Sequence, residues 1–367
     1  MNRQTAITVL VTLVLAATTP QMAHAMSYQD KVDFASGLEE ILGHFGALEQ
    51  NLDEGNTTLA LTHATHPIAE LYDAMKPVLR DSDPNLDALV EATLTELKNK
   101  ATTDVSRSQA QQAIDDAKDV VEMARLAIIG DDLSNDPAFK VALMRVLLET
   151  SVAEYGEAVA DGAITNPAEF QDGSAFVWRS QQILDTMRDD VDSGKIDLLY
   201  ADLWAAYDSK ADPSEVETIT EDIIRIIDEI FGIDSKSKDL LEYVENIRSL
   251  LDEANQEYRN GDKDMALSLV TRAYLDNYEF LESPLIEFGE EKLMVEVEIM
   301  LREDLRNMIK NSDSPSKVSA QIEAILEKMD MIAVVVPEFG TIVMMILVIA
   351  IISTVAISAR SRLALRT

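Results

Sequence analysis

The chain has 367 residues, of which 47% are hydrophobic, so it can bury the cores of one large or two ordinary domains and is too apolar for general disorder. Residues 26–340 contain all 66 acidic residues and 27 of the 31 Lys and Arg, a net charge of −39. A field of this sign repels nucleic acid and attracts cations, although it also suits a protein that only has to stay soluble. The absence of cysteine excludes disulfides, thiolate metal sites, covalently attached haem and cysteine nucleophiles.

The N-terminal segment predicts export. Arg3 precedes the apolar run AITVLVTLVLAA, and Ala23 and Ala25 form the small-x-small pattern at which a signal peptidase cleaves. We therefore expect a signal peptide over residues 1–25 and a mature chain that begins near Met26.

The exported part is predicted to be all-α. Apolar residues recur at intervals of three and four, as in VVEMARLAIIG and IIRIIDEIFGI, and alternation with a period of two is nearly absent. Short connectors favour antiparallel helical bundles. Five helix starts are marked by a capping side chain followed by proline, at Asp83-Pro84, Asp136-Pro137, Asn166-Pro167, Asp212-Pro213 and Ser314-Pro315. Charge and proline interrupt the apolar pattern over residues 208–215, so we predict bundle domains at 26–210 and 211–332.

The stretch LTHATHPIAELY contains the first candidate metal ligands. His63, His66 and Glu70 are spaced i, i+3 and i+7, which places them on one face of a helix, and His44 on the preceding helix is a possible fourth ligand. Imidazole with carboxylate suits Fe, Zn, Cu or Mn. Pro67 removes a backbone donor between these residues and is expected to disturb the helix. The alternative is that the histidines are ordinary polar surface residues.

A faint internal repeat relates this region to a later one. An offset of 206 residues aligns Gly55 with Gly261 and Tyr72 with Tyr278, and it also matches several residues between these pairs. Glycine followed by a helix with a shared tyrosine favours a duplication. Asn56, in the sequence NTT, is a candidate glycosylation acceptor in the turn after Gly55.

The second copy contains an acidic and aromatic set. Glu279 and Glu282 share one helical face, with Tyr278 beside them. Carboxylates at this spacing, together with a tyrosine, can hold a hard cation such as Fe³⁺, whereas a solvated charged face is the alternative.

Catalytic motifs are missing. HATHP lacks the glutamate that serves as general base in the His-Glu-x-x-His zinc peptidases, and the chain has neither a Gly-rich phosphate loop nor a Gly-x-Ser-x-Gly elbow. We predict that the protein is not an enzyme and binds no nucleotide or haem.

The C-terminal segment predicts a membrane anchor. Residues 341–357 carry no charge and, with their flanks, are about long enough to span a bilayer. The arginines that follow, Arg360, Arg362 and Arg366, favour a cytoplasmic C-terminus, which leaves the acidic part outside the membrane.

The junction before this helix resembles a known sorting signal. Pro337, Glu338, Phe339 and Gly340 precede the apolar run and the Arg-rich end, and this order resembles the PEFG-CTERM signal of archaeal surface proteins over residues 333–367. The resemblance implies an archaeal cell-surface protein whose tail is a substrate of an archaeosortase-like transpeptidase.

Three blocks of the exported part resemble the extracytoplasmic helical region of high-affinity iron permeases. ALSLVTRAYLDNYEFLESPL is similar to an AYxxxFExxE pattern, with Tyr274, Tyr278, Glu279 and Glu282 in its positions. LLETSVAEYGEAVADGAITNPAEF and HATHPIAELY are similar to two further blocks. The chain departs from the permease because it has one predicted membrane segment and no Arg-Glu-x-x-Glu motif in an apolar helix. The resemblance therefore implies an iron-binding accessory of a separate permease and not the transporter.

The leading hypothesis is an exported, surface-anchored helical protein that binds iron or another transition metal outside the membrane. The alternative is a structural or adhesion component of the archaeal envelope that uses its charge only for solubility.

Overall fold

The computed structural model describes residues 26–102, 105–188, 194–233 and 239–336 and confirms the prediction of an all-α fold. The only strands of these residues, β1 (Val159–Ala160) and β2 (Ala163–Ile164), form a short antiparallel ladder. No helix in these ranges is long and apolar enough to cross a membrane. The predicted signal peptide, the Pro337–Gly340 signal and the membrane helix after it lie outside the described residues.

All five predicted cap-proline pairs start helices. Asp83, Asp136, Asn166 and Asp212 each accept a hydrogen bond from a backbone N–H of the first turn, whereas Ser314 makes no such bond. The capping side chain satisfies a free donor, and proline costs nothing at a position whose N–H has no helical partner. The helices concerned are α4 (Pro84–Lys100), α7 (Pro137–Ala158), α8 (Pro167–Asp185), α10 (Pro213–Phe231) and α16 (Pro315–Val335).

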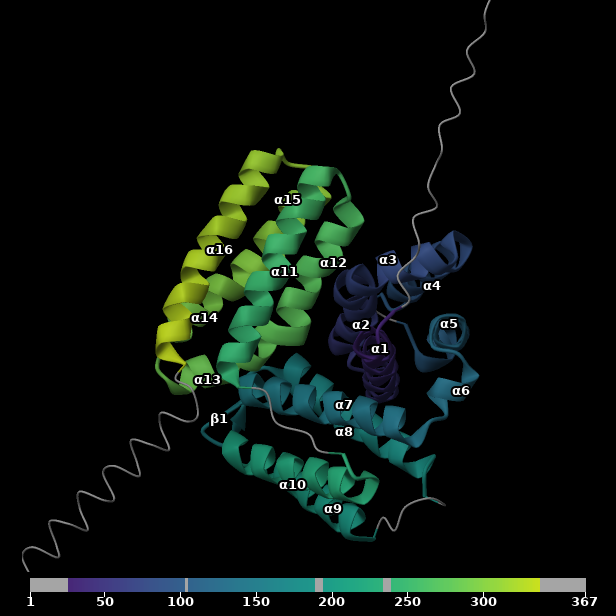
Figure 1. Cartoon of the computed structure of the whole chain (residues 1–367). Coiled ribbons are helices and arrows are strands. Elements are labelled where there is room, and N and C mark those ends of the chain that lie inside the picture. The colour runs from purple at the N-terminus through teal and green to yellow at the C-terminus, as the bar shows by residue number, and fades with distance from the viewer. Residues whose placement is uncertain (1–25, 103–104, 189–193, 234–238, 337–367) are drawn as a thin grey trace, which may run out of the picture.

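The helices form three groups, and the middle group contains α7 and α8, which cross the molecule (Figure 1). The first group is α1 (Tyr28–Glu54), α2 (Thr57–His66), α3 (Tyr72–Ser82), α4, α5 (Arg107–Ile128) and α6 (Asp131–Ser134). In the middle, α7 and α8 pack together, and α10 contacts both α7 and α9 (Gly194–Ser209). The third group is α11 (Leu240–Asn260), α12 (Lys263–Ala273), α13 (Glu279–Glu287), α14 (Glu291–Glu298), α15 (Arg306–Lys310) and α16.

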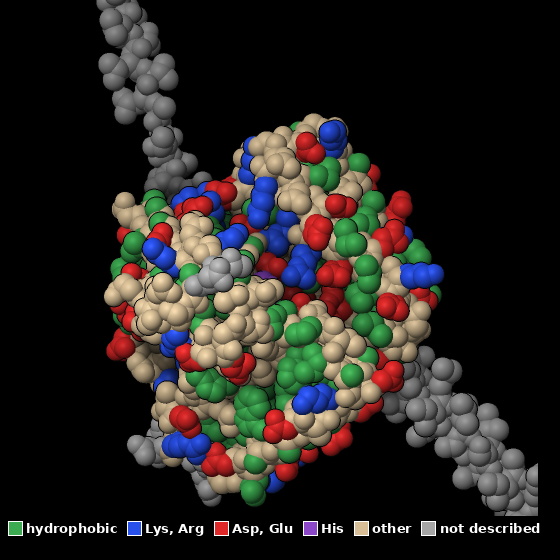
Figure 2. Space-filling model, turned by 180° about the vertical axis from the view of Figure 1, so that it is seen from behind, with side chains coloured by type: hydrophobic (Ala, Val, Ile, Leu, Met, Phe, Trp, Pro, Cys, Tyr) green, Lys and Arg blue, Asp and Glu red, His purple; other side chains and the backbone are tan. Residues whose placement is uncertain are grey.

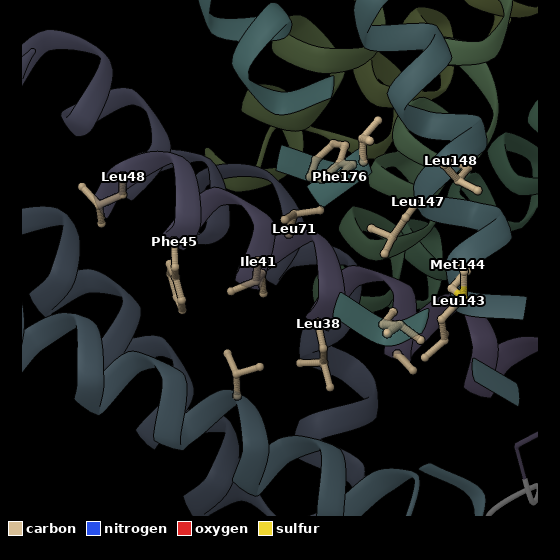
Figure 3. Close-up of a cluster of buried hydrophobic side chains, with 14 of the residues drawn as sticks. Leu38, Ile41, Phe45, Leu48, Leu71, Leu143, Met144, Leu147, Leu148 and Phe176 are labelled. Carbon is tan, nitrogen blue, oxygen red and sulfur yellow. The ribbon is translucent and has the colours of Figure 1, made fainter. Parts of the chain in front are cut away.

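Two hydrophobic cores hold these groups. The first joins α1–α10: the stripe of Leu38, Ile41, Phe45 and Leu48 runs along α1, and leucines of α7 lie in the same cluster (Figure 3). The second contains buried residues from α11 to α16. The boundary predicted at residues 210 and 211 falls between α9 and α10, which pack against each other within the first core. The described packing therefore divides between α10 and α11.

Three π-helical turns interrupt the α-helices. They are η1 (Pro67–Leu71), η2 (Tyr274–Tyr278) and η3 (Ile299–Leu305). In η1 the missing N–H of Pro67 breaks the α-helical ladder, and the N–H of Tyr72 donates to the carbonyl of Pro67 across the wider turn. The disturbance that the sequence predicts at Pro67 is thus a helical turn widened by one residue. Such turns are frequent at functional sites.

The order of elements supports the internal duplication. A long helix, a left-handed glycine, a capped short helix and a π turn occur as α1–Gly55–α2–η1 and again as α11–Gly261–α12–η2. The caps also correspond, because Asn56 accepts from Leu59 N–H and Asp262 accepts from Met265 N–H. Asn56 is exposed at this turn, and its glycosylation stays a prediction.

Candidate metal centre

Three histidines from two helices surround one aspartate. His44 Nδ1 lies 2.8 Å and His63 Nδ1 3.0 Å from Asp172 Oδ1, and His66 Nδ1 lies 3.3 Å from Asp172 Oδ2. One ligand atom from each of the four side chains lies within 4.8 Å of the other three. The structure therefore brings together the three histidines singled out in the sequence, around an acid that the sequence analysis missed.

The helices can approach closely here because glycine stands next to two of the four residues. A Cβ on Gly43, before His44, would lie 2.9 Å from Phe176 Cδ1, and one on Gly173, after Asp172, would lie 3.0 Å from the Ser151 carbonyl oxygen. Each glycine lets α8 pack closer to α1 or α7 than a larger residue would allow. His63 and His66 are one turn apart on α2, so both face this junction.

The hydrogen bonds fix which nitrogen of His63 faces the aspartate as an acceptor. Asn51 Nδ2 donates to Gln171 Oε1 at 2.8 Å, which identifies that atom of Gln171 as the oxygen. His63 Nε2 lies 2.7 Å from the same oxygen and must therefore carry the proton. In the neutral ring, His63 Nδ1 then presents a lone pair to the Asp172 carboxylate.

Three buried polar atoms meet here, and none of them makes a hydrogen bond of good geometry. They are His44 Nδ1, His63 Nδ1 and Asp172 Oδ1. Orphaned buried acceptors are costly, and a cation among them removes the cost. Ligands about 2.1 Å from one ion are about 3.0 Å apart at a right angle and about 3.4 Å apart in a tetrahedron. The observed nitrogen–oxygen separations of 2.8 and 3.0 Å fit the first geometry.

The electrostatics of the four groups are coupled. Burial alone would raise the pKa of Asp172, but the facing imidazoles hold it well below its usual range. Burial lowers the pKa of His44 and outweighs the attraction of Asp172. Burial would also lower the pKa of His66, but the hydrogen bond to Asp172 and the charges of Glu70 and nearby acids raise it to about 9. A metal ion at neutral pH would therefore displace one proton from the His66–Asp172 pair.

The other predicted ligands lie apart from these four. Glu70, in η1, forms an ion pair of 2.7 Å with Arg302 of η3. The hydroxyl of Tyr278 donates to the Met294 carbonyl at 2.8 Å inside the second core. Glu279 and Glu282 belong to a separate group of acids, described below.

Asp172 could have been found from its position on the helix. It lies one turn before Phe176, on the face of α8 that also buries Ser180. An acid on a buried stripe requires a partner or a ligand, and this signal is visible in the sequence once α8 is drawn as a helix.

A narrow cavity extends from the histidines into a group of glutamates, and Figure 2 shows acidic side chains gathered in a hollow with a histidine inside it. Its volume of about 30 Å³ has room for an ion with one or two waters and excludes most organic molecules. Among the described residues that line it, Arg302 is the only arginine or lysine and stands with His44 and His66 against seven acids: Glu40, Glu70, Glu154, Glu157, Glu169, Asp172 and Glu279. The size and charge of the cavity thus suit a small cation.

Several of these glutamates favour the protonated form. Burial, followed by the charges of Asp276 and Asp172, raises the pKa of Glu40 to about 8. Burial, with the charges of Glu169 and Glu298, raises the pKa of Glu157 to about 7 against the opposing effects of Glu282 and Arg302. Burial and neighbouring acids also raise the pKa of Glu154, Glu279 and Glu282 well above the usual value. Burial is the main reason that their neutral forms are favoured, and Arg302 offsets it only in part for Glu157 and Glu279.

Comparison with known families supports part of the sequence resemblance. A family model described as the iron permease-associated 4-helix bundle domain matches residues 130–234. This segment contains α7–α10, with Asp172 and the glutamates of α7, and the second of the three blocks on which the resemblance rests. Comparisons with curated proteins and with solved structures gave no match. Residues 130–234 are therefore similar to the iron permease-associated helical domain, while the PEFG-CTERM signal stays a prediction.

Proposed function

We propose that this protein is exported, anchored at the cell surface by its C-terminus, and binds a transition-metal ion through His44, His63, His66 and Asp172. The observation that carries the proposal is the buried convergence of His44 Nδ1 and His63 Nδ1 on Asp172 Oδ1, at 2.8 and 3.0 Å. Nitrogen with carboxylate oxygen suits Fe²⁺, Zn²⁺, Cu²⁺ and Mn²⁺. The match to the iron permease-associated domain favours iron among these metals.

The proposed role is capture and local concentration of the ion, which is then passed to a separate iron permease. The acidic surface attracts cations broadly, and the histidines select among them. Four protein ligands in a largely buried site favour retention of the ion over turnover, since catalytic metal sites keep a position open for substrate. The protein accordingly has no catalytic role in this proposal.

Calorimetric titration of the full chain tests the metal site. Zn²⁺, Cu²⁺, Fe²⁺ without oxygen, and Fe³⁺ as a chelate are each titrated in enough salt to screen diffuse binding to the acidic surface. We expect saturation at one ion per chain for at least one metal, and an affinity lower by about 100-fold or more in His63→Ala/His66→Ala.

The matched control is Asp252→Asn/Glu253→Gln, which removes two exposed acids far from the histidines in sequence. It should bind like the parent. Weak binding without stoichiometry that is equal in all three proteins would reject the metal site and leave an envelope or adhesion role as the better account.

A further inference from the structure

Ion pairs join the two helical units of the molecule, which are α1–α10 with the first core and α11–α16 with the second. Basic side chains of the second unit bind acids of the first: Arg272 binds Asp33 and Arg302 binds Glu70, each at 2.7 Å, and Arg306 and Lys310 bind Asp73 at 2.7 and 2.8 Å. A cavity of about 330 Å³ also lies between the units, with Phe34 and Met75 on one side and Leu269 and Phe280 on the other. A contact that is partly polar and incompletely packed favours relative motion of the two units.

Of these four basic residues, Arg302 alone lines the narrow cavity beside the histidines. It belongs to η3 of the second unit and shares the cavity of about 30 Å³ with His44, His66 and Asp172 of the first unit. Its guanidinium is always protonated. A metal ion held by the imidazoles therefore occupies the same small space as a permanent positive charge.

Contacts from all three π turns fix this charge in place. Arg302 Nη2 donates to Glu70 Oε1 of η1 at 2.7 Å, and Nη1 donates to the hydroxyl of Tyr274 of η2 at 3.4 Å. The guanidinium also lies over the Tyr274 ring, 5.6 Å from its centre. Glu298, one turn earlier on the same helix, accepts a further bond at 3.3 Å. Arg302 cannot leave the cavity wall without breaking contacts to both units.

We propose that Arg302 lowers the affinity of the histidine site for its metal ion, so that a bound ion and the docked second unit oppose each other. The inference rests on the proposed metal site. Like charges in a narrow, largely buried space repel with little screening. Movement of the second unit away from η1 withdraws the guanidinium and strengthens metal binding, and by linkage a bound ion weakens the docking by the same factor. Docking of the second unit then favours release of the ion, as a protein that captures and passes on an ion requires.

Calorimetric titration of the full chain with Zn²⁺ tests the role of the charge. Arg302→Gln removes the charge and should raise the Zn²⁺ affinity by about 10-fold or more, whereas Arg302→Lys restores a charge and should return the affinity toward that of the parent. Arg272→Gln is the matched control, because Arg272 also makes a 2.7 Å ion pair across the units and its side chain is 30% exposed against 26% for Arg302, but it does not line the narrow cavity. It should leave the affinity within about 3-fold of the parent.

The outcomes separate this inference from the proposed function. Saturable Zn²⁺ binding that is equal or weaker in Arg302→Gln would make Arg302 a structural partner of Glu70 and overturn the inference, while the metal site would stand. Equal gains in Arg302→Gln and Arg272→Gln would overturn it too, because the charge in the cavity would not be their cause. A lack of saturable binding in every protein would reject the metal site, and the inference with it.

A second measurement leaves Arg302 unchanged and applies even if its variant does not fold. The chain has no cysteine, so Ala92→Cys on α4 and Ala320→Cys on α16 place one spin label at an exposed position of each unit. Electron–electron resonance measures the distance between the labels over a series of salt concentrations that weaken the ion pairs. Zn²⁺ should increase the population of longer distances and shift its onset to lower salt, and it should have no such effect in His63→Ala/His66→Ala. Identical distances with and without bound Zn²⁺ at every salt concentration would overturn the inference.

Discussion

Two groups of buried acids in this molecule are treated in opposite ways. Glu39 of α1, 3% exposed, binds Arg125 of α5 at 2.8 Å and Arg179 of α8 at 2.5 Å. Glu282 is equally buried but faces the carboxyl group of Glu157. The first arrangement completes its own charge balance and joins three helices. In the second, two acids meet without a basic partner, and burial and their mutual repulsion favour the neutral forms.

The largest expected effect on stability comes from removing Glu39, the acid that binds Arg125 and Arg179. Glu39→Ala leaves two guanidinium groups without their shared partner, one of them on the largely buried Arg125, and should lower the free energy of unfolding by about 3–5 kcal/mol. Urea denaturation at pH 7 measures the loss. Glu49→Ala is the control on the same helix, because Glu49 also binds two cations, Arg107 and Lys118, but is partly exposed. It should cost less than about 1 kcal/mol, and equal losses would contradict the contrast.

Replacing Glu157 and Glu282 should instead raise the stability of the protein, and the gain should depend on pH. Glu157 has a folded-state pKa of about 7, above its unfolded value, so the metal-free protein loses stability as pH rises from about 4.5 through about 7. Glu157→Gln/Glu282→Gln should remove much of this loss and be more stable than the parent at pH 8, by about 2–3 kcal/mol, with little difference at pH 4.5. Urea midpoints between pH 4.5 and 8.5 test this. A variant less stable than the parent at pH 8 would show that the acids are structural.

A smaller effect is expected from the group that orients His63. Gln171→Leu removes the acceptor for His63 Nε2–H and should weaken Zn²⁺ binding by about 10- to 100-fold. Gln182→Leu on the same helix is the control, since its amide oxygen binds Arg179 instead. Calorimetric titration compares the two variants, and equal affinities would remove Gln171 from the site.

The smallest effect concerns the helix that carries two of the histidines. Asn56→Ala removes the cap of α2 and should cost about 1 kcal/mol of stability, with a modest decrease in Zn²⁺ affinity. Asp262→Ala removes the corresponding cap of α12 and should destabilise similarly without a change in Zn²⁺ affinity. Thermal melts and calorimetry distinguish them, and an equal effect of both variants on Zn²⁺ affinity would argue against a local role of α2.

Local signals predicted most of the fold. Cap-proline pairs such as Asp136-Pro137 mark helix starts because their physics is confined to a few residues. The division between the cores was harder to predict, because the charged residues 208–215 make a sharp turn between α9 and α10 while both helices continue to contribute to one core.

Local signals also predicted only part of the candidate site. His63 and His66 are neighbours through helix spacing, and His44 lies on the adjacent helix, so local reasoning reached all three. Asp172 is more than 100 residues further along the chain, and only tertiary packing past Gly43 and Gly173 brings it to the imidazoles. Glu70 was assigned from its i+7 spacing, with a disturbance expected at Pro67. In the structure η1 widens this turn and Glu70 meets Arg302, a partner that spacing alone cannot reveal.

The paired π turns separate what the two related halves share from what only one of them has. A π turn is an α-helix with one inserted residue, and η1 and η2 stand at matching places in the two halves of the duplication. The histidines are not shared, because Leu250, Leu269 and Arg272 occupy the positions that match His44, His63 and His66. The widened helix is therefore common to both halves, whereas only the first carries imidazoles at the matching positions.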